Sequence, residues 1–277
     1  MNVVLLYNYI CIYIYIQISI LSHLCYLCFT PLLFDFISII ETSVIFEYKY
    51  IIIYNNIKLD YNMTKFWEIG KKSVCILRNY VAHAKELNNP LPKKPIYFIK
   101  PTTAYLQENS GPILLPKGSD VHHEVELGVV IGETCTNVDE NDAMKYVDGY
   151  ALTIDMTARD IQTEAKNNSM PWTEAKCFDT FMPISTFIPK SQINDPHDIN
   201  LWLKVDDELR QDDSTNLMIF SIPTLISEIT KCMTLEKGDV IATGTPQGVG
   251  PVVDGQTIRA GIKGVIEMKF DVKDRGY

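Results

Sequence analysis

Two glutamates in alternate positions of one apolar segment are the strongest chemical signal in this sequence. Glu124 and Glu126 lie in the run V-H-H-E-V-E-L-G-V-V-I of residues 121–131, where apolar residues recur at every second position. This alternation predicts a β-strand with both carboxylates on one face, about 7 Å apart. Because two like charges on one face repel each other, a cation beside them would stabilise the pair.

A third carboxylate completes a candidate set of metal ligands. Asp155 ends the apolar run of residues 150–154, which predicts a second strand, and Glu126 leads directly into the apolar residues 127–131. Acids in such surroundings are expected to be buried, and a buried carboxylate needs a partner. Three carboxylates with open positions suit a hard cation such as Mg²⁺ or Mn²⁺. Without these apolar runs, alternate glutamates would indicate only the solvent face of an amphipathic strand.

Two polar pairs have the spacing that places side chains on one face of a helix. His83 and Glu86 are three positions apart, and so are Arg159 and Gln162. A His–Glu pair can activate a water molecule, and a guanidinium group suits bidentate binding of a carboxylate. Taken alone, each pair is equally explained by contacts on a solvated helix surface.

Further polar residues have both a functional and a structural interpretation. Lys176 follows Glu174 and Ala175, where it would be a solvated helix charge unless other residues bring it to a site. Thr245 lies in the Gly-rich run T-G-T-P-Q-G-V-G, whose hydroxyl and N–H groups could bind a carboxylate or form an ordinary turn. His122 and His123 would face opposite sides of the strand, and one of them is expected to pack or to support the carboxylates.

The elements that must hold these residues are short strands separated by a few helices. Helical spacing occurs at 79–87, 139–146, 157–166 and 224–232, and Asp206-Asp207 is the expected turn of a hairpin. Strands are expected at residues 73–77, 96–99, 113–115, 121–131, 149–155, 201–205, 238–242, 257–258 and 264–272. This pattern predicts one β-rich α+β domain over residues 63–277.

The composition of the 277 residues excludes some classes of function. The formal net charge is −9 and no block of Lys or Arg stands out, which argues against a nucleic-acid-binding groove. An acidic protein that binds an acidic substrate needs a local source of positive charge, and a bound metal ion is one candidate. The seven irregularly spaced Cys residues fit a reducing compartment better than a secreted disulfide scaffold.

Residues 1–62 differ from the remainder in composition. They contain no Ala, Gly or Arg, and the first 33 residues carry no Asp, Glu, Lys or Arg. The segment is long and apolar enough for a membrane anchor. Its residue types also match an upstream untranslated region read as protein, with Met63 as the native start, and this second interpretation is favoured. It lacks the Arg-rich amphipathic pattern of a transit peptide.

Several motifs, in their order along the chain, resemble the fumarylacetoacetate hydrolase family and especially its animal acylpyruvase branch. The resemblance extends over nearly all of residues 63–277. It rests on S-V-C-I-L-R-N-Y-V-A-H (73–83), F-I-K-P-T-T-A (98–104), H-H-E-V-E-L-G-V-V-I-G (122–132), D-G-Y-A-L-T-I-D-M-T-A-R-D (148–160), P-W-T-E-A-K (171–176) and the Gly-rich run 243–250.

The resemblance implies a mixed β-sandwich roll with a few peripheral helices, a homodimer, and a role for each candidate residue. Glu124, Glu126 and Asp155 would hold one Mg²⁺ or Mn²⁺, which binds the 2-oxo acid and stabilises an enolate. His83 would take a proton from water, Glu86 would orient it, and Lys176 would stabilise the developing negative charge. Substrate carboxylate contacts would come from Arg159, Gln162 and Thr245.

The implied activity is metal-dependent hydrolysis of acylpyruvates, with decarboxylation of oxaloacetate. One alternative is keto–enol tautomerisation of oxaloacetate, which needs the metal and an acid–base pair but no attacking water. A larger catabolic substrate is a second alternative, and a non-enzymatic binding protein tethered through residues 1–62 is a third. A membrane partner is otherwise not expected. The resemblance implies a mitochondrial location, and the cytosol stays open because no transit peptide is visible.

Overall fold

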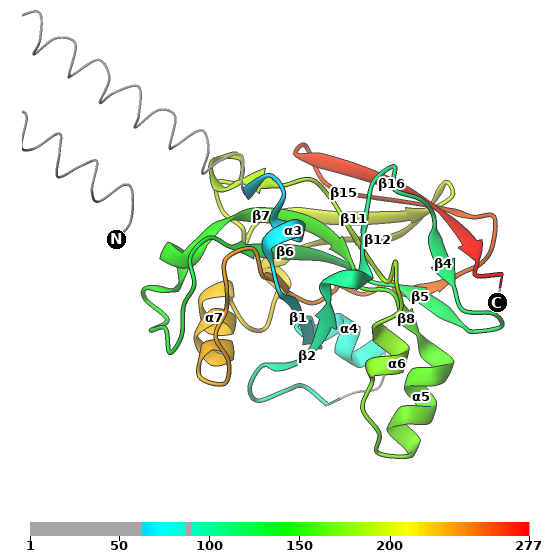
Figure 1. Cartoon of the computed structure of the whole chain (residues 1–277), viewed down its shortest axis with the longest axis horizontal. Coiled ribbons are helices and arrows are strands. Elements are labelled where there is room, and N and C mark those ends of the chain that lie inside the picture. Colours follow the sequence, from blue (N-terminus) through cyan, green and yellow to red (C-terminus); the bar gives the residue numbers. More distant parts are fainter. Residues whose placement is uncertain (1–62, 87–89, 277) are drawn as a thin grey trace, which may run out of the picture. The chain divides into compact units, whose positions relative to one another are not determined.

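The computed structural model describes residues 63–86 and 90–276, whose strands form three sheets (Figure 1). The predicted β-rich α+β class is confirmed. Residues 1–62, predicted to be an anchor or a translated upstream region, lie outside the described residues. No helix within the two described ranges is both long enough and apolar enough to span a membrane.

The largest sheet mixes parallel and antiparallel pairs. From one edge to the other its strands are β2 (Ile96–Pro101), β1 (Lys72–Leu77), β13 (Val240–Ala242), β6 (Val125–Ile131), β7 (Val147–Ile154), β9 (Met182–Ile184) and β3 (Tyr105–Gln107), and β10 (Ile188–Pro189) also pairs with β7. Strands β6 and β7 run antiparallel at its centre, whereas β1 and β13 are parallel. Strand β2 forms one edge.

Two smaller sheets complete the β-structure. The second sheet has the order β12 (Glu208–Ser214), β11 (Asn200–Val205), β15 (Thr257–Ile262), β16 (Ile266–Asp274) and β4 (Ile113–Leu115). The third has the order β14 (Gly250–Val252), β5 (Val121–His123) and β8 (Thr157–Ala158). The hairpin expected at Asp206-Asp207 is confirmed, because these residues connect the antiparallel strands β11 and β12.

Both faces of β6 are covered, which explains its continuous apolar sequence. All seven of its residues are buried. Leu127 and Val129 belong to the main core cluster, which also contains Leu203 of the second sheet. Val130 lies in a smaller cluster on the opposite face, together with Phe66. The first two sheets therefore pack as layers of a sandwich, and the burial expected around the carboxylates is observed.

The helices lie around these sheets (Figure 1). They are α3 (Phe66–Ile69), α4 (Val81–Glu86), α5 (Arg159–Asn167), α6 (Thr173–Lys176) and α7 (Ile222–Thr230), with single 3₁₀ turns η1 (Thr102–Ala104), η2 (Ala143–Tyr146), η3 (Lys190–Gln192) and η4 (Thr215–Leu217). Helix α7 begins where the Ser221 hydroxyl accepts from Thr224 N, followed by Pro223 in its first turn. Its apolar face, which includes Leu225 and Ile229, is buried.

Three expectations differ from the observed elements. The strand expected over 121–131 is divided at Glu124, because residues 121–123 pair in the third sheet and residues 125–131 pair in the first. The segment before Lys72, for which no helix or strand was expected, contains the short helix α3, in which Phe66 is buried. Of the helix expected over 139–146, only the 3₁₀ turn η2 forms.

Candidate active site and metal centre

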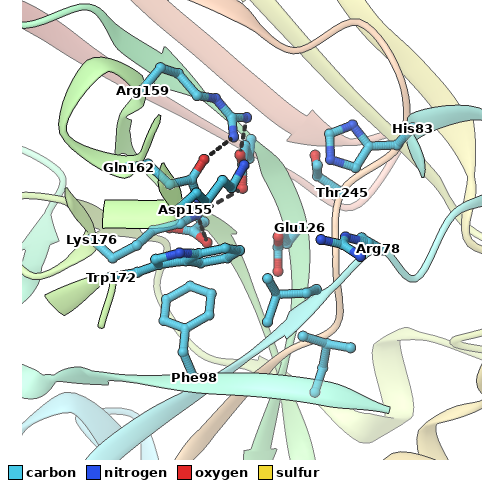
Figure 2. A pocket seen from close by; sticks show the side chains of 14 residues that line it. Arg78, His83, Phe98, Glu126, Asp155, Arg159, Gln162, Trp172, Lys176 and Thr245 are labelled. Atoms are coloured by element: carbon cyan, nitrogen blue, oxygen red, sulfur yellow. Dashed lines mark hydrogen bonds and ion pairs between the residues drawn. The ribbon is translucent and has the colours of Figure 1, made fainter. Parts of the chain in front are cut away.

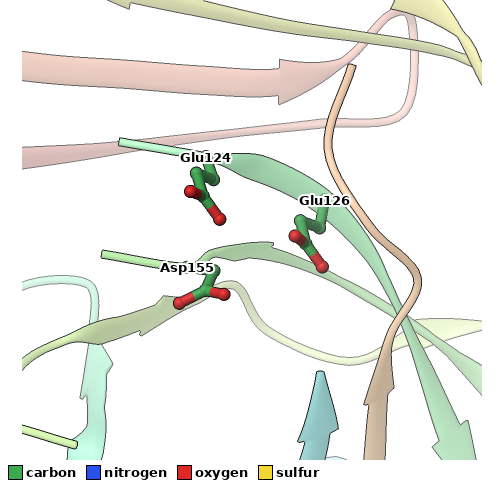
Figure 3. A group of neighbouring side chains, drawn as sticks. All are labelled: Glu124, Glu126 and Asp155. Atoms are coloured by element: carbon green, nitrogen blue, oxygen red, sulfur yellow. The ribbon is translucent and has the colours of Figure 1, made fainter. Parts of the chain in front are cut away.

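The three acidic residues meet where the chain passes from one sheet to another (Figure 3). Glu124 occupies the break between β5 and β6, Glu126 is the second residue of β6, and Asp155 follows β7. Asp155 N donates to Glu124 O at 2.8 Å, which fixes the two segments together. All three side chains are buried, and one oxygen of each lies within 4.8 Å of the others. The structure thus brings together the three predicted metal ligands.

Three cationic side chains surround this acidic cluster. Lys176 Nζ lies 2.7 Å from Asp155 Oδ2 and 3.1 Å from Glu124 Oε2. Arg159 pairs with Glu124 Oε1. The fully buried Lys100 of β2 lies 2.7 Å from Asp155 Oδ1 and donates to two backbone carbonyls as well. Three positive charges therefore face three carboxylates in a region removed from water.

The surrounding positive charges stabilise the ionised form of Glu124 more than that of Glu126. Although burial opposes ionisation, the charges of Lys176 and Arg159 hold the pKa of Glu124 well below its usual value. Burial, followed by the charges of Asp155 and Glu124, raises the pKa of Glu126 well above its usual value. The carboxylate of Glu126 accepts from Gly244 N at 2.8 Å. A hard divalent cation beside three carboxylates would stabilise the charged form of Glu126, so the residues present fit Mg²⁺ or Mn²⁺.

The His–Glu pair on α4 forms the expected side-chain contact. His83 Nδ1 lies 3.3 Å from Glu86 Oε2, and His83 is 5% exposed. The helix follows Asn79, whose buried carboxamide bonds the backbone of Thr243 and Phe220. These contacts attach the start of α4 to the Gly-rich turn and to the segment before α7.

The predicted substrate-binding residues are present at the same site, but all three already have hydrogen-bond partners. Besides Glu124, the Arg159 guanidinium contacts Gln162 Oε1 at 3.0 Å. The Thr245 hydroxyl donates to Val125 O at 2.8 Å, so its hydrogen is not directed at the pocket. To donate to a substrate carboxylate, this hydroxyl must first leave Val125 O, which limits the role predicted for it.

Figure 2 shows how these side chains converge from different segments. One small pocket is lined by all the predicted site residues except Glu86, which contacts His83 from the side. The pocket also has six lining residues without a predicted role: Ile76, Leu77, Arg78, Phe98, Lys166 and Trp172. Arg78 directly follows β1 and has a φ of 56°, an uncommon conformation for a residue with a side chain. Arg78 and Trp172 lie in the motifs 73–83 and 171–176, which indicated the family. The sequence assigned neither residue a function in the site.

Gln211 is a buried residue near the site that the sequence did not single out. Its Oε1 accepts from Val125 N at 3.0 Å and lies 3.1 Å from His123 Nδ1. Its Nε2 donates to Thr245 Oγ1 at 2.8 Å and to Pro246 O at 3.0 Å. The carboxamide thus joins the strand that carries the glutamates to the Gly-rich turn. His123 is fully buried in this contact, as expected for a packing or supporting residue.

Comparison with known proteins shows which proteins this chain resembles. Residues 72–273 match the family model described as fumarylacetoacetate (FAA) hydrolase C-terminal. The mitochondrial oxaloacetate tautomerase FAHD1 of Bos taurus is 53% identical over 216 residues, covering 78% of this chain and 97% of the relative. The mitochondrial oxaloacetate decarboxylase of Dictyostelium discoideum is 53% identical over 212 residues, covering 76% of this chain and 97% of the relative.

A solved structure gives the same result for the fold. The fumarylpyruvate hydrolase from Pseudomonas aeruginosa, in complex with Mn²⁺ and pyruvate, has a TM-score of 0.70 and 33% sequence identity. The match covers 74% of this chain and 91% of that one. The mixed β-sandwich fold implied by the motifs is therefore confirmed. Because the family model covers most of the chain and relatives exceed half identity, the chain belongs to the fumarylacetoacetate hydrolase family.

Proposed function

We propose that this protein is a divalent-metal enzyme that hydrolyses acylpyruvates to pyruvate and a carboxylic acid, and that it also acts on oxaloacetate. The observation that carries the hydrolytic part is the contact of His83 with Glu86 beside the pocket that holds the three carboxylates. The family assignment confirms the prediction of an enzyme over a non-enzymatic binding protein. Hydrolysis additionally needs a base for the attacking water, and His83 would supply it.

Side chains of this protein would perform most of the chemistry that acylpyruvate hydrolysis requires. A bound divalent cation would act as a Lewis acid on the 2-oxo group of the substrate. Since Glu86 contacts Nδ1 of His83, the other ring nitrogen is left to take a proton from water. Attack of this water on the acyl carbonyl would give a tetrahedral intermediate. Its collapse breaks the C–C bond, releases the carboxylic acid and leaves the electron pair on the pyruvate fragment as an enolate, which becomes pyruvate when His83 returns the proton. The ammonium group of Lys176 would stabilise that negative charge.

Arg159 and Gln162 would bind the substrate carboxylate. Arg159 is 14% exposed at its side chain and now pairs with Glu124. Glu124 meets the guanidinium through one oxygen only, whereas a substrate carboxylate can offer two acceptors, so it can replace this contact. The exchange would free Glu124 Oε1 for a cation.

Oxaloacetate tautomerisation is the second candidate function. The names of the Bos taurus and Dictyostelium discoideum relatives, at 53% identity, favour activity on oxaloacetate as tautomerase or decarboxylase. Both reactions and acylpyruvate hydrolysis pass through an enolate of a 2-oxo acid, so one site serves them all. The names of these relatives also support a mitochondrial location for this protein. The homodimer stays a prediction.

Acetylpyruvate is the substrate that tests hydrolysis. The purified protein is mixed with acetylpyruvate in excess Mg²⁺, in excess Mn²⁺ and in EDTA, and loss of the substrate's ultraviolet absorbance is followed with pyruvate measured at the end. Rapid pyruvate release that EDTA stops is the expected result. If folded, metal-bound protein releases no pyruvate but converts enol-oxaloacetate to the keto form, tautomerisation replaces hydrolysis as the proposed function.

A further inference from the structure

A groove lined by apolar side chains adjoins the candidate active site. Its volume is about 590 Å³. Among the described residues, ten line it, none of these carries a formal charge, and nine are apolar or aromatic. Strand β2 at the edge of the largest sheet provides one wall, and the segment before α6 provides another. The groove thus differs sharply in chemistry from the charged pocket beside it.

Three side chains belong to both spaces. Leu77, Phe98 and Trp172 line the pocket and the groove, so the two spaces adjoin at these residues. The rings of Phe98 and Trp172 lie 6.3 Å apart at 60°, and the Phe98 ring is 4.9 Å from Lys176 Nζ. Figure 2 shows both rings beside Lys176 and Asp155. A substrate held at the carboxylates would therefore meet these aromatic rings where the groove begins.

The sizes of the two spaces indicate how they divide a substrate between them. The pocket has a volume of about 40 Å³, which suffices for a few water molecules but not for a large organic acid. The groove lies within the range of roughly 300–1,000 Å³ that is usual for small-molecule sites. Any part of a substrate beyond its 2-oxo acid head therefore finds its space in the groove.

The lining of the groove selects the chemistry of that part. Ile96, Ile99 and Met170 are 43%, 44% and 49% exposed, which is unusual for a cluster of large apolar side chains. A hydrocarbon chain would cover them and gain from leaving water. A carboxylate at the end of such a chain would lose hydration, and none of the residues that line the groove offers it a positive charge.

We propose that this groove is the subsite for an apolar acyl chain of the substrate, so that the enzyme prefers 2,4-dioxo acids with aliphatic or aromatic acyl groups over those with acidic ones. The inference rests on the proposed function in one respect, because the 2-oxo acid head must bind at the carboxylate cluster. It goes further in assigning the selective residues: Met170 and Ile99 contact the chain, and Phe98 with Trp172 forms the entrance.

Binding of three 2-oxo acids to the Mg²⁺-saturated protein tests the subsite without turnover. The acids are pyruvate, 2-oxooctanoate and 2-oxooctanedioate, the last two having equal length and differing in a terminal carboxylate. Each buried methylene group strengthens binding about fourfold, so a partly covered chain should make 2-oxooctanoate bind at least tenfold more tightly than pyruvate. The diacid is expected to bind no more tightly than pyruvate. Dissociation constants are measured by isothermal titration calorimetry.

A charged residue placed in the groove should remove this preference. In the variant Met170→Glu, the ratio of the dissociation constants of pyruvate and 2-oxooctanoate is expected to fall close to one. The matched control is Leu209→Glu, since Leu209 is also 49% exposed and lines neither space. This control should bind both acids as the unchanged protein does.

The outcomes separate this inference from the proposed function. Equal affinity for pyruvate and 2-oxooctanoate, or tight binding of the diacid, overturns the subsite even if acetylpyruvate is hydrolysed. Tight binding of 2-oxooctanoate that does not depend on Mg²⁺ also overturns it, because the head is then not at the carboxylates. Mg²⁺-dependent chain-length preference without acetylpyruvate hydrolysis supports the subsite and removes hydrolysis alone.

Discussion

Glu86 accepts hydrogen bonds from the backbone N–H of Gly248, at 3.1 Å to Oε1 and 3.3 Å to Oε2, although 162 residues separate the two. The same carboxylate contacts His83 Nδ1. The Gly-rich turn near the end of the chain therefore fixes the orientation of the His–Glu pair near its start. Gly248 has a φ of +92°, and a Cβ atom there would lie 2.0 Å from Arg210 O.

The variant Gly248→Ala should displace this turn and reduce hydrolysis of acetylpyruvate at least tenfold. The backbone clash moves the N–H away from Glu86, which then no longer orients His83. Gly255→Ala is the matched control, since Gly255 has a φ of +85° and a Cβ atom there would meet no described atom within 4 Å. Both variants carry a conformational cost of about 1–2 kcal/mol, but only the first should lose turnover. Equal turnover in the two would show that the turn does not position Glu86.

His83→Ala should lower hydrolysis of acetylpyruvate by roughly 10² to 10⁴-fold, the usual contribution of a general base. The measurement is kcat in Mg²⁺, with circular dichroism to verify folding. His197→Ala is the control, because His197 contacts Ile222 N at 3.0 Å and Asp195 at 3.5 Å and does not line the pocket. Hydrolysis that survives loss of His83 would exclude its role as general base and favour a reaction that needs no attacking water.

The sequence predicted the site better than it predicted the elements that carry it. Glu124, Glu126 and Asp155 were expected to converge, and they do, although one continuous strand was expected for the two glutamates. The break at Glu124 has no local signature, because His123 and Val125 are both buried on either side of it and the alternation continues. Only the change of pairing partner divides the strand, and pairing depends on distant segments.

Gln211 and Lys100 show a second reason why parts of the site escaped prediction. Gln211 lies in the polar strand E-L-R-Q-D-D-S, where nothing in the sequence distinguishes the inward side chain from its exposed neighbours. Its four partners come from segments at least 34 residues away. Lys100 follows apolar residues at the edge of a sheet, a place where a lysine is usually solvated. Its burial depends on Asp155 and two carbonyls that are distant in sequence.

Asn79→Ala should destabilise the fold by at least about 2 kcal/mol, because buried groups that now bond its carboxamide would lose their partner. Asn79 is fully buried, donates to Thr243 O at 2.8 Å and accepts from Phe220 N at 2.7 Å. In a chain of this size, that cost lowers the melting temperature by about 4–8 °C. The exposed Asn141, changed to Ala, should alter the melting temperature by no more than a degree or two. Similar changes of melting temperature in both variants would mean that the hydrogen bonds of the Asn79 carboxamide contribute no more to stability than those of an exposed asparagine.

Lys176→Met tests whether the buried ammonium group of Lys176 neutralises the same carboxylates that a bound metal ion would neutralise. Lys176 Nζ contacts both Asp155 and Glu124, so its loss should cost about 3–5 kcal/mol of stability in EDTA. A divalent cation would neutralise the same oxygens, and Mg²⁺ should therefore raise the melting temperature of the variant more than that of the unchanged protein.

The control for this comparison is Lys145→Met, which removes an exposed lysine paired with Asp142 and should leave the Mg²⁺ response as it is. Turnover of acetylpyruvate by Lys176→Met should stay at least about 100-fold reduced in saturating Mg²⁺, because the metal cannot replace the ammonium opposite the developing enolate. An identical Mg²⁺ shift in all three proteins would place the cation away from Glu124 and Asp155, and full turnover in the variant would remove Lys176 from the reaction.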